Sequence, residues 1–250
     1  MESLAGCVVM LTRDYPDTTR VDGQELEVWL KAPGSRPTPK LNRHLGSAFL
    51  VTAGKAAILV TAAHVARRMD GEALVSFRRS SGARASAPLG KLVARRERRL
   101  PWRYHGHADV AALRLGWTPP GLRGQLLPHD RLRAVATAPE GAEQLLVMGF
   151  PLGLFAERDF APVVKRAHAA SGLVRFYSEE LTGPAVFFFL DEAAMGGYSG
   201  GPVFTAPAVS LAEPQCVGLV SQTVSDDAGG RLTAIVPSHV IRRAVARAAP

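Results

Sequence analysis

Four glycines surround a single serine in the segment Gly196-Gly197-Tyr198-Ser199-Gly200-Gly201-Pro202. Glycine accepts positive φ values and lets another backbone approach closely. A loop of this kind can aim successive N–H groups at one point, as the stabilisation of a developing oxyanion requires. Taken alone the loop is weak evidence, because many glycine-rich loops are simple turns. It lacks the lysine and the spacing of a phosphate-binding loop.

Two further segments carry a histidine and an acid. In Val60-Thr61-Ala62-Ala63-His64-Val65 an apolar strand runs into two alanines, which let the backbone turn and leave His64 at a cleft. The segment 107–115 begins an apolar strand with Asp109. Considered separately, a histidine such as His64 is more often structural than catalytic, and an acid such as Asp109 is more often a turn or cap residue. Together with Ser199 they follow the chain order His, Asp, Ser, which is that of one class of catalytic triads.

These motifs, T-A-A-H-V, D-V-A-A-L-R-L and G-x-S-G-G-P, resemble those of the trypsin-like serine peptidases. The second half is similar to the peptidase domain of the HtrA/Deg branch in four places, namely 147–153 (VMGFPLG), 170–174 (ASGLV), 191–194 (DEAA) and 234–238 (AIVPS). The resemblance covers roughly residues 45–245. It implies a serine endopeptidase that acts on protein or peptide substrates, in a limited set of proteins.

The resemblance also implies roles for single residues. His64 would be the general base, Asp109 its orienting acid and Ser199 the nucleophile that forms an acyl-enzyme. The backbone N–H groups of Gly197 and Ser199 would bind the oxyanion. Ser221 matches the family serine that supports the triad aspartate.

The expected specificity pocket is lined by Ala193, Tyr198 and the segment Ser221-Gln222-Thr223. Ala193 stands where trypsin has the aspartate that selects basic residues. Thr223 occupies a position that is often glycine when the pocket is deep. We therefore expect a small or medium apolar residue before the cleaved bond. A shift of the loop would instead bring Asp191 into the pocket and select Arg or Lys.

Departures from the family pattern limit what the resemblance implies. Tyr198 precedes the nucleophile where trypsin has aspartate and the HtrA branch usually has asparagine, so activation by a new N-terminal ammonium is not expected. No PDZ domain is expected after Pro250. Oxyanion loops of the HtrA branch can rest in an inactive conformation, which leaves open an activating protein partner.

The apolar runs between turn signals predict an all-β fold of two antiparallel β-barrels closed by a C-terminal helix, with residues 1–125 in the first barrel and 126–250 in the second. Strands are expected at 46–52, 56–61, 74–77, 89–94, 110–115, 131–137, 144–150, 163–177, 184–190, 201–204, 215–223 and 232–236. A short helix is expected at 62–68. A second is expected at 240–248, with Ser238 as its N-cap.

The charge and the cysteine content limit which binding partners and which cellular compartment are expected. The formal net charge of +8 comes mostly from arginine, and the densest run, Lys91 to Arg99, reads best as a solvated surface, with docking of an acidic partner as the alternative. No aromatic residues are interleaved with it, so nucleic-acid binding is not expected. The two cysteines, Cys7 and Cys216, allow at most one disulfide, which favours a reducing compartment or a bacterial member of the fold.

Several other functions are disfavoured. No secretory signal or membrane-spanning segment is visible, so a cytoplasmic location without membrane contact is expected. The segment His105-Gly106-His107-Ala108-Asp109 begins like a metallo-β-lactamase signature, but Val110 stands where a histidine should follow. No metal and no cofactor are therefore expected. The remaining alternatives are a catalytically silent scaffold that binds a partner protein and, less favoured, a basic nucleic-acid-binding protein.

Overall fold

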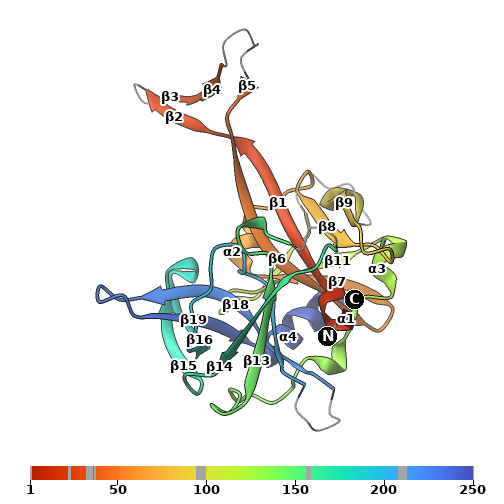
Figure 1. The fold of residues 1–250 in the computed structure, drawn as a ribbon, viewed down its shortest axis with the longest axis vertical. Coiled ribbons are helices and arrows are strands. Elements are labelled where there is room, and N and C mark those ends of the chain that lie inside the picture. Colours follow the sequence, from red (N-terminus) through yellow and green to blue (C-terminus); the bar gives the residue numbers. More distant parts are fainter. Residues whose placement is uncertain are drawn as a thin grey trace.

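The computed structural model describes residues 2–21, 24–31, 36, 38–93, 100–155, 159–207 and 213–249. Strands dominate these residues and form two large sheets that lie side by side, with a long ribbon rising from the first (Figure 1). All strand pairs are antiparallel except that of β12 with β6. The predicted all-β class with a C-terminal helix is confirmed.

The first sheet has the strand order β10-β11-β7-β6-β1-β8-β9, with β12 beside β6. It is built from β1 (Val8–Pro16), β6 (Leu41–Ala53), β7 (Ala56–Thr61), β8 (Leu74–Arg78), β9 (Arg84–Pro88), β10 (Arg103–Tyr104), β11 (Ala111–Leu115) and β12 (Leu127–Pro128). All six residues of β7 are buried, which explains the unbroken apolar sequence of its first five residues. This strand leads directly into the histidine segment.

The second sheet has the strand order β14-β13-β17-β18-β19-β16-β15. Its strands are β13 (Gln144–Gly149), β14 (Val163–His168), β15 (Val174–Ser178), β16 (Gly183–Leu190), β17 (Pro202–Thr205), β18 (Cys216–Ser225) and β19 (Arg231–Pro237). The ladder between β18 and β19 is irregular between Val220 and Gln222. Such a bulge re-aims side chains, and here it falls at Ser221.

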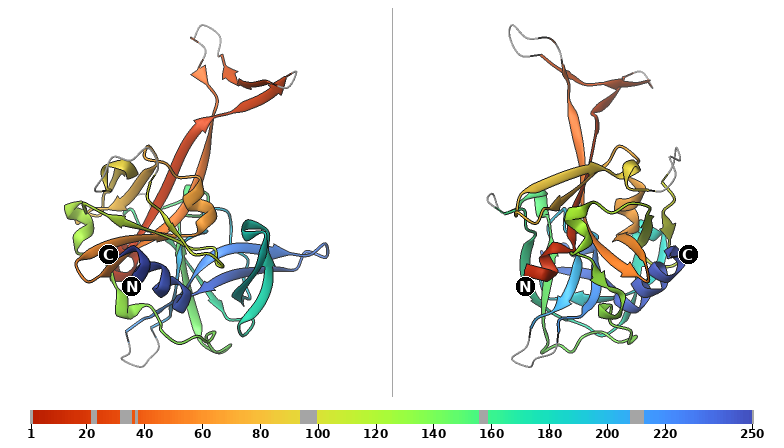
Figure 2. Two further views of the ribbon diagram at one scale, coloured as in Figure 1. Left: turned by 180° about the vertical axis from the view of Figure 1, so that it is seen from behind. Right: turned by 90° about the vertical axis from the view of Figure 1, so that its right-hand side faces the viewer.

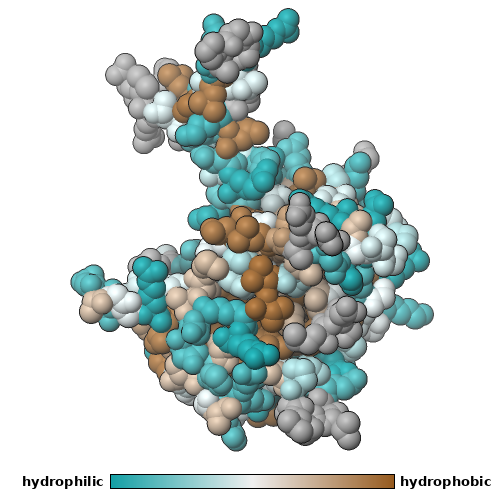
Figure 3. Space-filling model, viewed as in Figure 1, coloured by the Kyte–Doolittle hydropathy of each residue, from teal (hydrophilic) through white to brown (hydrophobic). Residues whose placement is uncertain are grey.

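The ribbon is the outer half of the β1–β6 pair, and it was not predicted from the sequence. Beyond β1 the chain forms two small hairpins, β2 (Thr18–Val21) with β3 (Gln24–Glu27) and β4 (Trp29–Leu30) with β5 (Thr38–Pro39). The ribbon stands clear of the body in all three views (Figures 1 and 2). Arg43 pairs with Asp14 across it, and Lys40 pairs with Asp17. Hydrophobic residues, among them Trp29 and Leu30, are exposed near its tip (Figure 3).

The helices are short apart from the last. They are α1 (Glu2–Gly6), α2 (Ala63–Arg67), α3 (Pro120–Arg123) and α4 (Ser238–Ala248), with 3-10 turns η1 (Leu89–Lys91), η2 (His129–Arg131), η3 (Pro151–Gly153) and η4 (Glu179–Leu181). Ser238 was predicted as the N-cap of α4, and this was wrong. The N-cap is Pro237, and the Ser238 hydroxyl donates to the Arg133 carbonyl oxygen at 2.6 Å. Among the described residues no helix is long and apolar enough to cross a membrane.

Three strand predictions were wrong. The segment 89–94 begins with η1, whose central Gly90 packs against the Gly71 backbone. The segment 131–137 has an alternating sequence but only one ladder contact, the isolated bridge between Leu132 and Cys216. The segment 163–177 is two strands, because the chain bends around Ser171-Gly172 between β14 and β15. In the first two cases periodicity alone did not reveal whether a neighbouring strand was present, and in the third it did not reveal the bend.

The arginine-rich run extends over residues 94–99, which lie outside the described residues, so its role stays a prediction. The predicted boundary at residues 125 and 126 likewise stays a prediction, although the two sheets divide the chain between β12 and β13. Buried side chains of both sheets join in one core, and a second cluster fills the second sheet around Tyr198 and Val203.

Candidate active site

Tight side-chain contacts link His64 to Asp109. The α2 helix begins directly after β7, and Ala62 and Ala63 are both fully buried at this turn. His64 therefore projects from a fixed backbone. Its Nδ1 lies 2.8 Å from Asp109 Oδ2, and its backbone N–H donates to Asp109 Oδ1 at 3.0 Å. The carboxylate thus fixes both the imidazole and the backbone that carries it.

Asp109 is completely buried, just before β11. The Ser221 hydroxyl donates a third hydrogen bond to its Oδ2 at 2.6 Å. Burial raises the pKa of Asp109, but the hydrogen bonds and charge of His64 and the bond from Ser221 outweigh it. The net result is a pKa below the usual value for aspartate. The carboxylate is therefore ionised near neutral pH and holds Nδ1 of His64 in the protonated form, which leaves Nε2 free to accept a proton.

Ser199 lies in the glycine loop between the two sheets. Its hydroxyl donates to the Ser221 carbonyl oxygen at 3.1 Å. Within the described residues no hydrogen bond joins it to the His64 ring. Bonds of this kind are often long in the absence of substrate and tighten when the site is occupied. Ser221 thus contacts both Asp109 and Ser199.

The glycines of the loop serve specific geometric needs. Gly197 has a φ of +101° and Gly200 a φ of +84°. A Cβ atom at Gly200 would lie 2.1 Å from Thr61 Oγ1 and 2.2 Å from the Ser47 carbonyl oxygen. The loop therefore reaches the backbone of the first sheet, and only glycine permits this approach. In the described part of the chain, the N–H groups of Gly197 and Ser199 donate no hydrogen bond.

The region of the expected specificity pocket is nearly closed. The Thr223 hydroxyl donates to the Ala194 carbonyl oxygen at 2.9 Å, and Lys165 Nζ donates to the Ala193 carbonyl oxygen at 2.6 Å. Ala193 and Tyr198 line a cavity of only about 10 Å³. The Tyr198 side chain is otherwise packed in the core and is 1% exposed. Asp191 pairs with His168.

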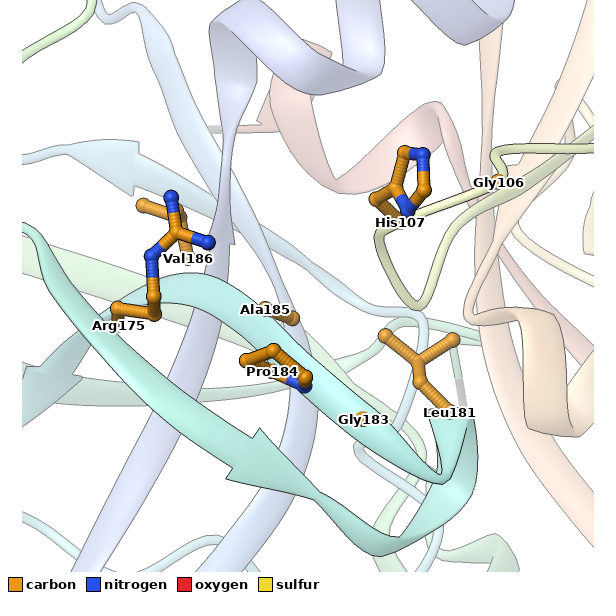
Figure 4. Close-up of a pocket in the computed structure, with 8 residues that line it drawn as sticks. All are labelled: Gly106, His107, Arg175, Leu181, Gly183, Pro184, Ala185 and Val186. Atoms are coloured by element: carbon orange, nitrogen blue, oxygen red, sulfur yellow. The ribbon is translucent and has the colours of Figure 1, made fainter.

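Larger hollows flank the site on the side of the β15–β16 hairpin. One, of about 490 Å³, is lined by Gln222 and Thr223 of β18 and by Phe176, Tyr177 and Glu180. The other, of about 460 Å³, lies between His107, in the segment that leads to Asp109, and the hairpin residues Arg175, Leu181 and Pro184 (Figure 4). The ladder places β17 beside β18 only up to Leu219, so within the described residues no strand pairs with residues 222–225 on the side away from β19, and this edge is free. An extended peptide can add to such an edge.

Two residues of the site were missed by the sequence analysis. Ser47 donates a hydrogen bond to the Gly197 carbonyl oxygen at 2.6 Å, and the Leu152 N–H donates to the Gly196 carbonyl oxygen at 2.8 Å. The small residues around Ser47 were the only available signal of a close approach. No metal-binding group of three or more His, Cys, Asp or Glu side chains occurs in the described ranges.

The geometry thus joins an ionised buried carboxylate, an oriented imidazole, a hydroxyl and two unpaired N–H groups. Such a set can move a proton from the hydroxyl to the imidazole while the hydroxyl oxygen attacks an acyl carbon. The N–H groups can then stabilise the resulting oxyanion. This is the chemistry of acyl transfer.

Comparisons with known proteins agree with this fold. Residues 46–208 match the family model described as trypsin-like peptidase domain. Among solved structures, an HtrA-type protease, AlgW, with a decapeptide has a TM-score of 0.57 at 16% identity, over 99% of this chain and 66% of that protein. Human heparin-binding protein has a TM-score of 0.54 at 12% identity, over 99% of this chain and 92% of that protein. The search of curated proteins finds no match.

Proposed function

The chain belongs to the family of trypsin-like peptidase domains, and from this premise we propose that it is a serine endopeptidase. The observation that carries the proposal is the continuous contact from Asp109 to His64, and through Ser221 to Ser199. In this assignment Asp109, His64 and Ser199 form the catalytic triad. Gly197 and Ser199 supply the N–H groups of the oxyanion hole.

The mechanism follows from the protonation states. Nε2 of His64 takes the Ser199 proton as the hydroxyl attacks the peptide carbonyl carbon. Asp109 stabilises the imidazolium, which then protonates the leaving amine. Water, activated by His64, hydrolyses the acyl-enzyme and regenerates Ser199. Each N–H group of the oxyanion hole is worth about 3 kcal/mol in the transition state.

The proposed substrates are proteins or peptides bound in an extended form along the free edge of β18. The decapeptide named with the HtrA-type neighbour supports a protein or peptide as the substrate. We assign Gln222 and Thr223 to the substrate backbone, and Ala193 and Tyr198 to the base of the specificity pocket. A limited set of substrates, a cytoplasmic location and an activating partner stay predictions.

The closed pocket supports a small or medium apolar residue before the cleaved bond. The bond between Thr223 and Ala194 ties the two walls of the pocket together. Profiling with a peptide library should therefore give Ala or Val at this position, and Thr223→Gly should admit larger residues. A preference for Arg or Lys in the wild type would refute the assignment of the pocket.

A catalytically silent scaffold that binds a partner is the second candidate. It is favoured by one observation, the bond of the Ser199 hydroxyl to Ser221 instead of His64. Labelling with a fluorophosphonate separates the two. We expect labelling at Ser199, mapped by mass spectrometry, that is absent in Ser199→Ala and in heat-unfolded protein. Absence of labelling in the folded wild type would favour the scaffold.

A further inference from the structure

Ser47 connects both sheets at the glycine loop. It lies in β6 and is completely buried. Its backbone N–H donates to the Ser199 carbonyl oxygen at 2.9 Å, and its own carbonyl oxygen accepts from Thr61 Oγ1 at 2.7 Å. Its side-chain oxygen accepts from the Phe150 N–H at 2.9 Å and donates to the Gly197 carbonyl oxygen at 2.6 Å. The backbone N–H, the carbonyl oxygen and the hydroxyl of this residue are therefore all hydrogen-bonded to residues in or next to the candidate site.

The side-chain bonds of Ser47 join two loops of the second half of the chain. One is the segment 150–153, and the other is the glycine loop. The Leu152 N–H donates to the Gly196 carbonyl oxygen at 2.8 Å, so the two loops are also bonded directly. Replacing Ser47 with alanine removes the hydroxyl and would leave the buried Phe150 N–H and the buried Gly197 carbonyl without partners, which is costly.

The bond from the Leu152 N–H fixes the direction of the peptide between Gly196 and Gly197, and the Ser47 hydroxyl holds the carbonyl of the next peptide, that between Gly197 and Tyr198. None of the described peptide bonds is cis. In a planar trans peptide the C=O and the N–H point in opposite directions. Because the Gly196 carbonyl points at Leu152, the Gly197 N–H points away from the segment 150–153 and stays available to a ligand. A flipped peptide would lose the bond to Leu152 and present an oxygen in place of a donor.

The backbone at Leu152 is strained in a way that fits this arrangement. Its φ is +52°, a left-handed conformation that is uncommon for leucine. Its side chain is 68% exposed, so no burial offsets the strain. Residues in sparsely populated conformations persist where several contacts with the surrounding structure hold them in place. They cluster at functional sites. In this conformation the Leu152 N–H points at the Gly196 carbonyl oxygen and donates a hydrogen bond to it.

We propose that Ser47 is a positioning residue that, together with the Leu152 N–H, holds the glycine loop with the Gly197 N–H ready for an oxyanion. This inference rests on the proposed function. It further implies that the loop has its active conformation in the free chain, and that an activating partner is not needed to turn the Gly196–Gly197 peptide.

The test compares Ser47→Ala with Ser76→Ala. Ser76 is a matched control, because it too is completely buried in the first sheet, and its hydroxyl is bonded to Ser86 and Arg84. For Ser47→Ala we expect kcat to fall at least tenfold with KM nearly unchanged. The upper limit is the roughly 10²- to 10³-fold cost of losing one oxyanion donor. Affinity for a peptide boronate, which mimics the oxyanion, should fall in parallel, and affinity for a product peptide should not.

A second measurement needs neither a variant nor catalysis. Amide hydrogen exchange followed by NMR in the wild type should show a protected Leu152 N–H and a rapidly exchanging Gly197 N–H. A fluorophosphonate reaction of the wild type tests the proposed function separately. Unchanged kcat in a folded Ser47→Ala protein would overturn the proposal. So would a protected Gly197 N–H beside an unprotected Leu152 N–H.

Discussion

Replacing Asp109 with asparagine tests the proposed mechanism most directly. The carboxylate accepts three hydrogen bonds, two from His64 and one from Ser221. An amide keeps all three contacts in one orientation only, with its oxygen toward the His64 backbone N–H and its NH₂ group toward His64 Nδ1 and the Ser221 oxygen. Nδ1 then becomes an acceptor and Nε2 carries the proton. His64 in that tautomer cannot take the Ser199 proton.

The expected loss in Asp109→Asn is about 10⁴-fold in kcat, or about 5 kcal/mol of transition-state stabilisation. The folded state should change less, by no more than about 2 kcal/mol, because weaker hydrogen bonds are offset by relief of a buried charge. The assay is steady-state cleavage of a peptide selected by profiling, together with thermal unfolding.

Asp70→Asn is the control for Asp109→Asn. Asp70 likewise accepts three hydrogen bonds, two from backbone N–H groups and one from the Arg13 side chain, but it lies outside the proposed triad. Its variant should keep the wild-type kcat. A folded Asp109→Asn protein with kcat within tenfold of the wild type would refute the role assigned to the carboxylate.

Two further predictions concern stability and reactivity. Because the pKa of Asp109 is lowered in the folded state, its contribution to stability is present above the unfolded pKa of about 4 and is lost as the pH falls through the folded value. Ser221→Ala removes one donor and raises that pKa, so circular dichroism should show acid unfolding beginning at a higher pH. Cys7 and Cys216 are buried free thiols, and burial raises the pKa of both, that of Cys216 to about 12. Neither should react with Ellman's reagent at pH 8 until denaturant is added, and fast reaction of the native protein would contradict the packing.

The contact between His64 and Asp109 was predictable because each residue sits in a short motif whose local sequence fixes its backbone. Asp109 precedes an apolar strand and His64 follows one, and the structure places these strands, β11 and β7, side by side. Family resemblance then supplied the pairing. The region of Ala193 and Thr223 was located in the same way, although the sequence did not reveal how far Lys165 and Thr223 close it.

The role of Ser47 was not predictable, because it depends on contacts between distant parts of the chain. Its hydroxyl bonds to residues about 100 and 150 positions away, and nothing in the residues around it specifies those partners. The ribbon was missed for a different reason. Only the first half of β1, Val8 to Thr12, is buried, and it is apolar up to Leu11, whereas the outer half carries polar residues that pair with β6 alone. Without a buried face, its sequence resembles a loop.

Tyr198, the residue before the proposed nucleophile Ser199, shows how the loop is held without the aspartate that trypsin has at this place. The Tyr198 ring is buried in the core of the second sheet and lies against Gly149, where a Cβ atom would approach Tyr198 Cδ1 to 2.8 Å. Burial of an aromatic side chain is worth about 2–3 kcal/mol and does not depend on a charge. An ion pair at this place would require a new ammonium group to arrive before the loop could be ordered. The buried Tyr198 ring and the bonds from Ser47 to Gly197 and Ser199 hold the loop by packing and hydrogen bonding, so we expect the proposed activity not to depend on a new ammonium group.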